Sequence, residues 1–350
     1  MSQSDPEPQR YELRTADNQV LRLTRYVGGN KGPVLVVHGV GVWSGMFALP
    51  TVEQNFKQYL VANGYDVWLF DWRGSTQLPL TQFTFDQAAE YDYPPAVALI
   101  QRETGADSVQ AVVHCAGSST FFMSLARGLL PTVRSVACSQ VALHYEVPTS
   151  TEAKAWLRLP DLLAASGRDY MTPNEDPSQP LFQTLFGQMV DTVHHECRST
   201  VCHRITFLYG HLYSHARMNT ETHDRLHEQF GKCNILAFRH LAQLALAGTA
   251  QRFDHGALEN RRRYGTEQPP SYLDPRHLRI PITFVSGANN RTFVPRSTEL
   301  THDWLVSKND PSLYRRHVLP DYGHIDTFMG ATANRDAYPL FLEHLERTQP

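Results

Sequence analysis

The sequence lacks the features that mark several large classes of protein. No apolar run reaches the roughly 18–20 residues needed to cross a bilayer. The longest basic run, Arg261 to Arg263, is too short to form a nucleic-acid-binding surface, and the formal net charge is only −3. We therefore expect no integral membrane segment and no nucleic-acid partner. With 41% hydrophobic and 19% charged residues, the composition is that of a globular protein.

Cysteine is also scarce. The 350 residues contain five cysteines, an odd number scattered along the chain at Cys115, Cys138, Cys197, Cys202 and Cys233. The first residues are polar and slightly acidic, unlike a secretory signal. We expect reduced thiols and a cytoplasmic location. The oligomeric state is left open by the sequence.

Short β-branched runs alternate with helical patterns through much of the chain. The expected strands are residues 34–37, 65–70, 109–113, 133–138, 280–285 and 316–319, preceded by a hairpin within 11–26. The expected helices are residues 52–63, 86–104, 117–129 and 335–347. This alternation predicts an α/β fold with a mostly parallel central sheet and flanking helices.

Between about 150 and 250 the strand-like runs disappear. Helical spacing over 153–165, 181–195 and 234–247 takes their place. We therefore predict three segments: 1–145 as the first part of an α/β core, 146–250 as a helical cap insertion, and 251–350 as the second part of the core. Aromatic, Leu and Met side chains are frequent in the cap and are expected to pack its helices and to line a lipophilic pocket.

Cys115 stands where the strand 109–113 turns into a helix, in the string His114-Cys115-Ala116-Gly117. Many hydrolytic enzymes place Gly-x-Ser-x-Gly at such a turn, with the serine as nucleophile. Here cysteine replaces the serine and Val113 replaces the first glycine. A thiol at this helix N-terminus would be exposed at the sheet edge and favoured as thiolate. The alternative is a buried, inert cysteine.

Three further segments supply partners for such a nucleophile. The turn His38-Gly39-Val40-Gly41 follows a strand, so the N–H groups of Val40 and Ala116 are the predicted oxyanion donors. His324 lies in a loop after the last predicted strand and is the candidate base. Asn290 follows the preceding strand, where an acid would be expected. The residues predicted to touch substrate are His38, Gly39, Gly41, Val42 and His114.

The cysteine at position 115 and the asparagine at position 290 are chemically compatible departures from a serine and an acid. Replacing the acid of a serine protease by Asn costs about 10⁴-fold in activity. A thiol ionises near pH 8.5, and beside a histidine it can form a thiolate–imidazolium pair. An amide that only orients the histidine is then sufficient, as in the Cys-His-Asn set of papain-like proteases. The predicted catalytic set is Cys115, His324 and Asn290.

Several strings in this order resemble the acid lipase branch of the α/β-hydrolase superfamily, the gastric and lysosomal lipases, from about 34 to 347. They are VVHGVGVWSGMF, GYDVWLFDWRGSTQ, EYDYPPAVALIQRETGADSVQAVVHCAGSS, RFDHGALENRRRYGTEQPPSYL and LPDYGHIDTF. The resemblance implies an α/β-hydrolase fold and an esterase or lipase that acts on apolar acyl esters beneath a helical cap. Cys115 and Asn290 depart from the serine and aspartate of that family. Cysteine at this turn is similar to dienelactone hydrolases and polyhydroxyalkanoate synthases.

Other polar residues have structural interpretations. The string Asp71-Trp72-Arg73-Gly74 predicts a loop that is held by an ion pair between Arg73 and a carboxylate. Asp326 is predicted to accept hydrogen bonds from the end of a nearby helix or loop. The string His194-His195-Glu196-Cys197, followed by Cys202-His203, contains metal-ligand types at a spacing that matches no zinc pattern. We therefore predict no metal and no cofactor.

The sequence thus predicts a cysteine-dependent enzyme that forms an acyl-thioester on Cys115. Its substrate would be an ester or thioester of a lipophilic acyl group, free or bound to CoA or a carrier. Two alternatives remain open. The same site could serve an acyltransferase or cyclase, in which a nucleophile other than water accepts the acyl group. The chain could also be a non-catalytic binding protein that retains a relic site.

Overall fold

The computed structural model describes residues 6–178, 184, 187, 188, 190 and 196–350. Its central sheet has the strand order β1-β2-β4-β3-β5-β6-β9-β10, in which β2 runs antiparallel to its neighbours β1 and β4 and the other neighbouring strands pair in parallel. The strands are β1 (Gln9–Arg14), β2 (Val20–Tyr26), β3 (Pro33–Val37), β4 (Asp66–Asp71), β5 (Val109–His114), β6 (Val133–Ser139), β9 (Ile282–Gly287) and β10 (Tyr314–Leu319). Each predicted strand and the N-terminal hairpin are present.

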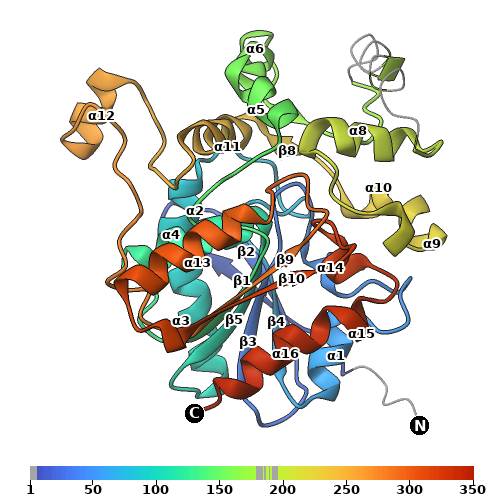
Figure 1. Cartoon of the computed structure of the whole chain (residues 1–350), viewed down its shortest axis with the longest axis vertical. Coiled ribbons are helices and arrows are strands. Elements are labelled where there is room, and N and C mark those ends of the chain that lie inside the picture. Colours follow the sequence, from blue (N-terminus) through green and yellow to red (C-terminus); the bar gives the residue numbers. More distant parts are fainter. Residues whose placement is uncertain (1–5, 179–183, 185–186, 189, 191–195) are drawn as a thin grey trace.

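Helices cover both faces of this sheet (Figure 1). One face packs against α1 (Phe56–Ala62), α14 (Asp326–Met329), α15 (Ala333–Asp336) and α16 (Tyr338–Arg347). The other packs against α2 (Phe85–Tyr91), α3 (Tyr93–Thr104), α4 (Cys115–Ala126) and α13 (Arg296–Lys308). Side chains on both faces are fully buried in β3, β4 and β5, which explains why these strands read as continuous apolar runs.

A group of short helices lies beyond one edge of the sheet (Figure 1). It comprises α5 (Thr149–Trp156), α6 (Leu159–Ala165), α8 (Thr200–Tyr209), α9 (Thr220–Asp224), α10 (Leu226–Gln229) and α11 (Ile235–Ala247), with the two-residue strands β7 (Tyr170–Met171) and β8 (Cys233–Asn234). We call this group, together with the segments that connect its elements and lead into α8, the cap. Beyond it, α12 (Ala257–Tyr264) stands apart from the sheet. The short 3₁₀ turns are η1 (Ser44–Phe47), η2 (His215–Arg217) and η3 (Pro311–Leu313).

Proline explains where the predicted helices divide. The helix expected over 86–104 is split at Asp92, because Pro94 and Pro95 fit only in the first turn of a new helix. The helix expected over 153–165 is split at Arg158, which has a φ of 49° and precedes a helix with Pro160 in its first turn. The pattern over 181–195 falls mostly outside the described residues. The helix α13 was not predicted.

Candidate active site

Cys115 occupies a strained turn at the carboxyl end of β5. Its φ is 57°, a left-handed conformation that side chains other than glycine rarely adopt and that costs of order 1–3 kcal/mol. Two glycines allow the close approach of the neighbouring loop. A Cβ on Gly117 would lie 2.1 Å from the carbonyl oxygen of His38, and one on Gly39 would lie 2.8 Å from the Cβ of Cys115. The strand-to-helix turn therefore has the geometry of a nucleophile elbow.

The predicted oxyanion donors face the Cys115 sulfur. Burial raises the pKa of Cys115 to about 12, against hydrogen bonds from the backbone N–H groups of Ala116 and Val40, which lower it. These two N–H groups come from the start of α4 and from the loop after β3. A carbonyl group attacked by the sulfur would thus form its oxyanion beside two donors that are already oriented.

His324 lies within reach of the thiol. One ring nitrogen each of His324 and His114 and the sulfur of Cys115 are within 4.8 Å of one another. His114 is held by a contact of 3.1 Å between its Nδ1 and the hydroxyl of Ser139, while both ring nitrogens of His324 have no hydrogen-bond partner among the described residues. The ring of His324 packs in a tilted orientation against the rings of His114 and Phe293. His324 is therefore a base within reach of the thiol whose ring nitrogens are not engaged by another described residue.

The predicted hydrogen bond between Asn290 and His324 is not formed. Asn290 donates from Nδ2 to Oε1 of Gln140 at 2.9 Å, and its Oδ1 accepts from the backbone N–H groups of Thr292 and Phe293. Both ends of the amide are thereby occupied. Asn290 shapes the loop after β9, and the position of His324 depends on packing and on its own backbone.

The thiol and the imidazole are both neutral at physiological pH. Burial lowers the pKa of His324 to about 3 and raises that of Cys115 to about 12. The resting thiolate–imidazolium pair expected from the sequence is therefore disfavoured, because its two charges would be desolvated. A reaction at this site would transfer the proton during attack.

Above the thiol, a cavity separates the sheet edge from the cap. It contains about 1120 Å³ of space, counting the part that opens to solvent. Gly39, Val42 and His114, three of the residues predicted to touch substrate, belong to its wall. Apolar side chains of the cap also line it, including Phe207, Leu208, Ile235, Phe238 and Leu241. The predicted substrate contacts His38 and Gly41 are not among the described wall residues.

Buried contacts explain why these two residues are elsewhere. The ring of His38 is completely buried, with its Nε2 3.6 Å from Oδ1 of Asp71. Gly41 has a φ of 78°, and the hydroxyl of Tyr209 lies 2.1 Å from where its Cβ would be. Both residues support the oxyanion loop from behind the cavity surface.

Tyr209 is a candidate functional residue that the sequence placed only among the aromatic, Leu and Met side chains expected to pack the cap or line its pocket. It ends α8 and lines the cavity, yet its buried hydroxyl has no hydrogen-bond partner among the described residues. A buried hydroxyl without a partner is costly, so it is a candidate donor to bound substrate. An unsatisfied hydroxyl leaves no signal in a sequence.

The structural interpretations of two other residues are confirmed. Arg73 forms ion pairs with Asp92 at 2.6 Å and with Asp17 at 2.8 Å, which clamp its loop. Asp326 accepts from the backbone N–H groups of Gly323 and Ser214. His194 and His195 lie outside the described residues.

No protein-family model matches the sequence. The chain is 25% identical over 370 residues to the lysosomal acid lipase/cholesteryl ester hydrolase of Macaca fascicularis, covering 97% of this chain and 88% of that one. It is 25% identical to the gastric triacylglycerol lipase of Mus musculus over 357 residues, 94% of this chain and 86% of that one.

Among solved structures, the chain superimposes on an esterase of Thermogutta terrifontis with a TM-score of 0.59 and 14% identity, covering 98% of this chain and 100% of that one. A lipase in an open form gives a TM-score of 0.57 with 15% identity, over 98% and 99% of the two chains. The chain has the α/β-hydrolase fold. Its lipase and esterase relatives support its assignment as a hydrolase of ester bonds. In the described part of the hydrolase, no helix is long and apolar enough to span a membrane.

Proposed function

We propose that the hydrolase cleaves an ester or thioester of a lipophilic acyl group through a covalent thioester on Cys115. The observation that carries the proposal is the position of the thiol. It sits on a strained elbow, opens into the cavity, and has the N–H groups of Val40 and Ala116 at its sulfur. An inert structural cysteine needs none of these features.

The proposed reaction uses one base in two half-reactions. His324 takes the thiol proton as the sulfur bonds to the carbonyl carbon, and the oxyanion forms at Val40 and Ala116. The tetrahedral intermediate collapses, the bond from the carbonyl carbon to the leaving oxygen or sulfur breaks, and the leaving alcohol or thiol takes the proton from His324. Water then attacks the thioester and gives its proton to His324. The acid is released and the proton returns to Cys115.

The cavity favours an apolar acyl chain. Its wall beyond the reacting groups is formed mainly by Leu, Ile, Val, Phe and Met side chains, and the lipase relatives act on lipids according to their names. Its size accommodates a group larger than acetyl. A polar acyl group would leave its hydrogen bonds to water unreplaced there.

Transfer to an acceptor other than water is the second candidate function. The cavity wall offers few groups to hold a water molecule. This scarcity slows hydrolysis of the thioester. Added alcohols or amines would then capture the acyl group in proportion to their concentration, and product analysis would measure this partition.

A burst experiment tests the proposal. p-Nitrophenyl octanoate mixed with the enzyme is expected to release p-nitrophenol in an initial phase that matches the amount of protein, followed by slower turnover. Cys115→Ala and His324→Ala should lose the burst. Cys233→Ala changes a buried thiol outside the cavity wall and should keep it. Equal bursts in all four proteins would refute the proposal.

A further inference from the structure

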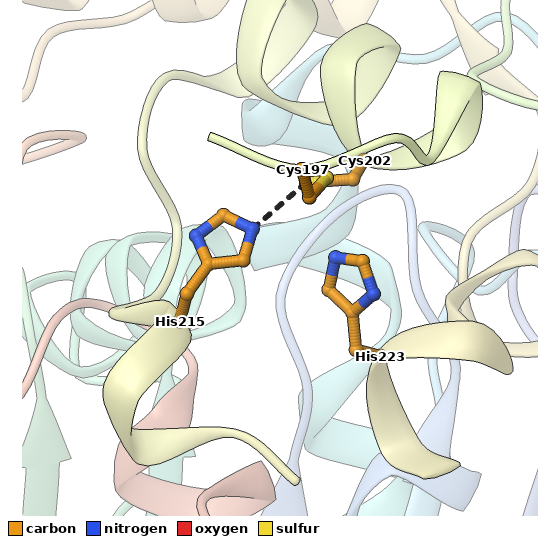
Figure 2. A group of neighbouring side chains, drawn as sticks. All are labelled: Cys197, Cys202, His215 and His223. Atoms are coloured by element: carbon orange, nitrogen blue, oxygen red, sulfur yellow. Dashed lines mark hydrogen bonds between the residues drawn. The ribbon is translucent and has the colours of Figure 1, made fainter. Parts of the chain in front are cut away.

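A second cluster of reactive side chains lies in the cap, away from the cavity. Figure 2 shows Cys197, Cys202, His215 and His223 with both imidazole rings turned toward the two sulfurs. One ligand atom from each lies within 4.8 Å of the other three. Cys197 precedes α8, Cys202 lies in its first turn, His215 begins η2, and His223 lies in α9. None of the four is a described wall residue of the cavity.

Each histidine presents a single nitrogen to the cluster. Nδ1 of His215 lies 3.0 Å from a carboxylate oxygen of Glu196, which leaves Nε2 to face Cys202 at 3.4 Å. In His223, Nδ1 lies 3.6 Å from a carboxylate oxygen of Asp224. Its Nε2 is buried and has no hydrogen-bond partner among the described residues. Metal-binding histidines commonly hold a carboxylate on the other nitrogen, which fixes the ring and its tautomer.

Both sulfurs accept hydrogen bonds, which suits thiolates. The backbone N–H of Ser199 points at the sulfur of Cys197 at 3.4 Å, and the hydroxyl of Tyr213 donates to the sulfur of Cys202 at 2.9 Å. Cys202 also lies at the N-terminus of α8, where the helix dipole favours negative charge. The donors surrounding the cluster thus complement two anionic sulfur ligands.

We propose that these four side chains bind one Zn²⁺ as a closed, structural site. Two thiolates and two imidazoles in a tetrahedron are the ligands that zinc prefers. With zinc–sulfur bonds near 2.3 Å and zinc–nitrogen bonds near 2.0 Å, the edge between a sulfur and a nitrogen is about 3.5 Å. The contact between Cys202 and His215 already has that length, at 3.4 Å. Binding releases the two thiol protons, so the site carries no net charge.

Zinc would fasten the part of the cap that meets the catalytic loop. The ligands flank Leu212, whose carbonyl oxygen accepts from the backbone N–H groups of His324 and Ile325 at 2.9 and 2.7 Å. Ser214, next to the ligand His215, donates from its N–H to Asp326. A metal that ties the start of α8 to η2 and α9 therefore holds the segment on which the His324 loop rests. This role is independent of the chemistry proposed for Cys115.

The sequence did not reveal the site because the spacing of its cysteines and histidines matches no zinc pattern. His203, which follows Cys202 directly, is not part of the cluster, because its Nε2 lies 2.8 Å from the carbonyl oxygen of Cys197. The true ligands follow the spacing C-x4-C-x12-H-x7-H, with the second histidine too distant for a zinc-finger pattern. The turn of the chain through η2 brings His223 beside the other three ligands.

Metal analysis of the whole chain tests the proposal. Protein purified with a reductant and without chelators should contain one zinc per chain by plasma mass spectrometry. Apo-protein given Co²⁺ should show the intense visible bands of tetrahedral cobalt and a thiolate charge-transfer band. Cys202→Ser and His223→Gln should weaken zinc binding by at least about 100-fold, measured by competition with a chromophoric chelator, and Glu196→Gln by about 10-fold or more. Cys233→Ser is the matched control and should bind like wild type.

Thermal unfolding gives a readout that does not depend on turnover. Zinc should raise Tm of the apo-protein by about 5 °C or more, and this rise should vanish in Cys202→Ser. Three results would overturn the proposal: no stoichiometric zinc in wild type with no tetrahedral cobalt spectrum, equal binding by Cys202→Ser, or a reductant-purified chain lighter by two hydrogens with Cys197 and Cys202 joined as a disulfide. The wild-type cobalt spectrum keeps the test decisive if a variant fails to fold.

Discussion

The backbone N–H of His324 donates to the carbonyl oxygen of Leu212 at 2.9 Å, so a residue of the cap holds the loop that carries the candidate base. This contact substitutes for the side-chain partner that the ring of His324 lacks among the described residues. The cap therefore does more than cover the cavity. It fixes the base beside Cys115. We therefore expect substitutions in this part of the cap to alter turnover by moving His324.

Asn290 offers the first test. Replacing it with Asp puts a carboxylate oxygen against Oε1 of Gln140, which also accepts from the N–H of Gly287. A buried, poorly paired carboxylate is costly, so Asn290→Asp should lower the free energy of unfolding by about 1–3 kcal/mol in urea titrations. The neighbouring exposed Asn289→Asp is the control and should change it little. A more stable Asn290→Asp enzyme with faster turnover would show that residue 290 does reach His324.

The pH dependence of alkylation tests the protonation state of the thiol. With the pKa of Cys115 raised to about 12 by burial, the thiolate fraction rises about tenfold per pH unit below that value. Iodoacetamide should therefore label Cys115 about ten times faster for each unit between pH 6 and 9, measured by quantitative peptide mass spectrometry. A rate that is level from pH 6 to 8 would reveal a resting thiolate–imidazolium pair and contradict the neutral site.

Tyr209 is expected to contribute to turnover at no cost in stability. Its buried hydroxyl has no partner among the described residues, so Tyr209→Phe removes an unsatisfied group and should leave Tm unchanged or higher. If the hydroxyl donates to bound substrate, kcat/KM should fall by about 5- to 20-fold. Tyr59→Phe, on α1, is the control. Tyr59 is not among the described wall residues of the cavity, so this change should leave kcat/KM unaltered. Unchanged kcat/KM in Tyr209→Phe would show that the Tyr209 hydroxyl does not contribute to turnover.

Acid stability follows from the buried imidazole. Burial lowers the pKa of His324 to about 3, below its unfolded value of 6.5, so the unfolded chain binds a proton that the folded chain refuses. Stability from this group is complete above pH 6.5 and falls as the pH drops toward 3. Burial raises the pKa of Asp326 to about 6, which acts in the opposite direction.

A variant isolates the histidine from that neighbour. Between pH 7 and 5 the wild type should lose about 2 kcal/mol through His324, and His324→Gln should lose that much less. Asp326 is present in both proteins, so its contribution cancels in the difference. Denaturant titrations at the two pH values measure it. Identical losses in both proteins would mean that His324 is not buried in the neutral form.

The core of the fold could be predicted because its signals are local. A fully buried strand such as β5 reads as an apolar run, and the elbow at Cys115 and the glycine turn after β3 lie directly beside such strands. Prolines divided two helices that periodicity alone had joined. The helix α13 escaped prediction because its buried residues are mostly Ser and Thr, which carry no apolar stripe.

The site was less predictable where it depends on distant residues. Asn290 is held by Gln140, 150 positions away, and this pairing removes it from His324. The depression of the pKa of His324 results from burial under the cap, which no local string encodes. The cluster of Cys197, Cys202, His215 and His223 is assembled by irregular turns, so its spacing matched no known pattern.

The most direct test of the central claim is the location of the acyl group. Wild type quenched in acid during turnover of p-nitrophenyl octanoate should gain the mass of one octanoyl group, and peptide mapping should place it on Cys115. Hydroxylamine at neutral pH should remove it, as expected for a thioester. Cys115→Ala should gain no adduct and His324→Ala should form it far more slowly. An octanoyl group on another residue, or full turnover by Cys115→Ala, would contradict the account.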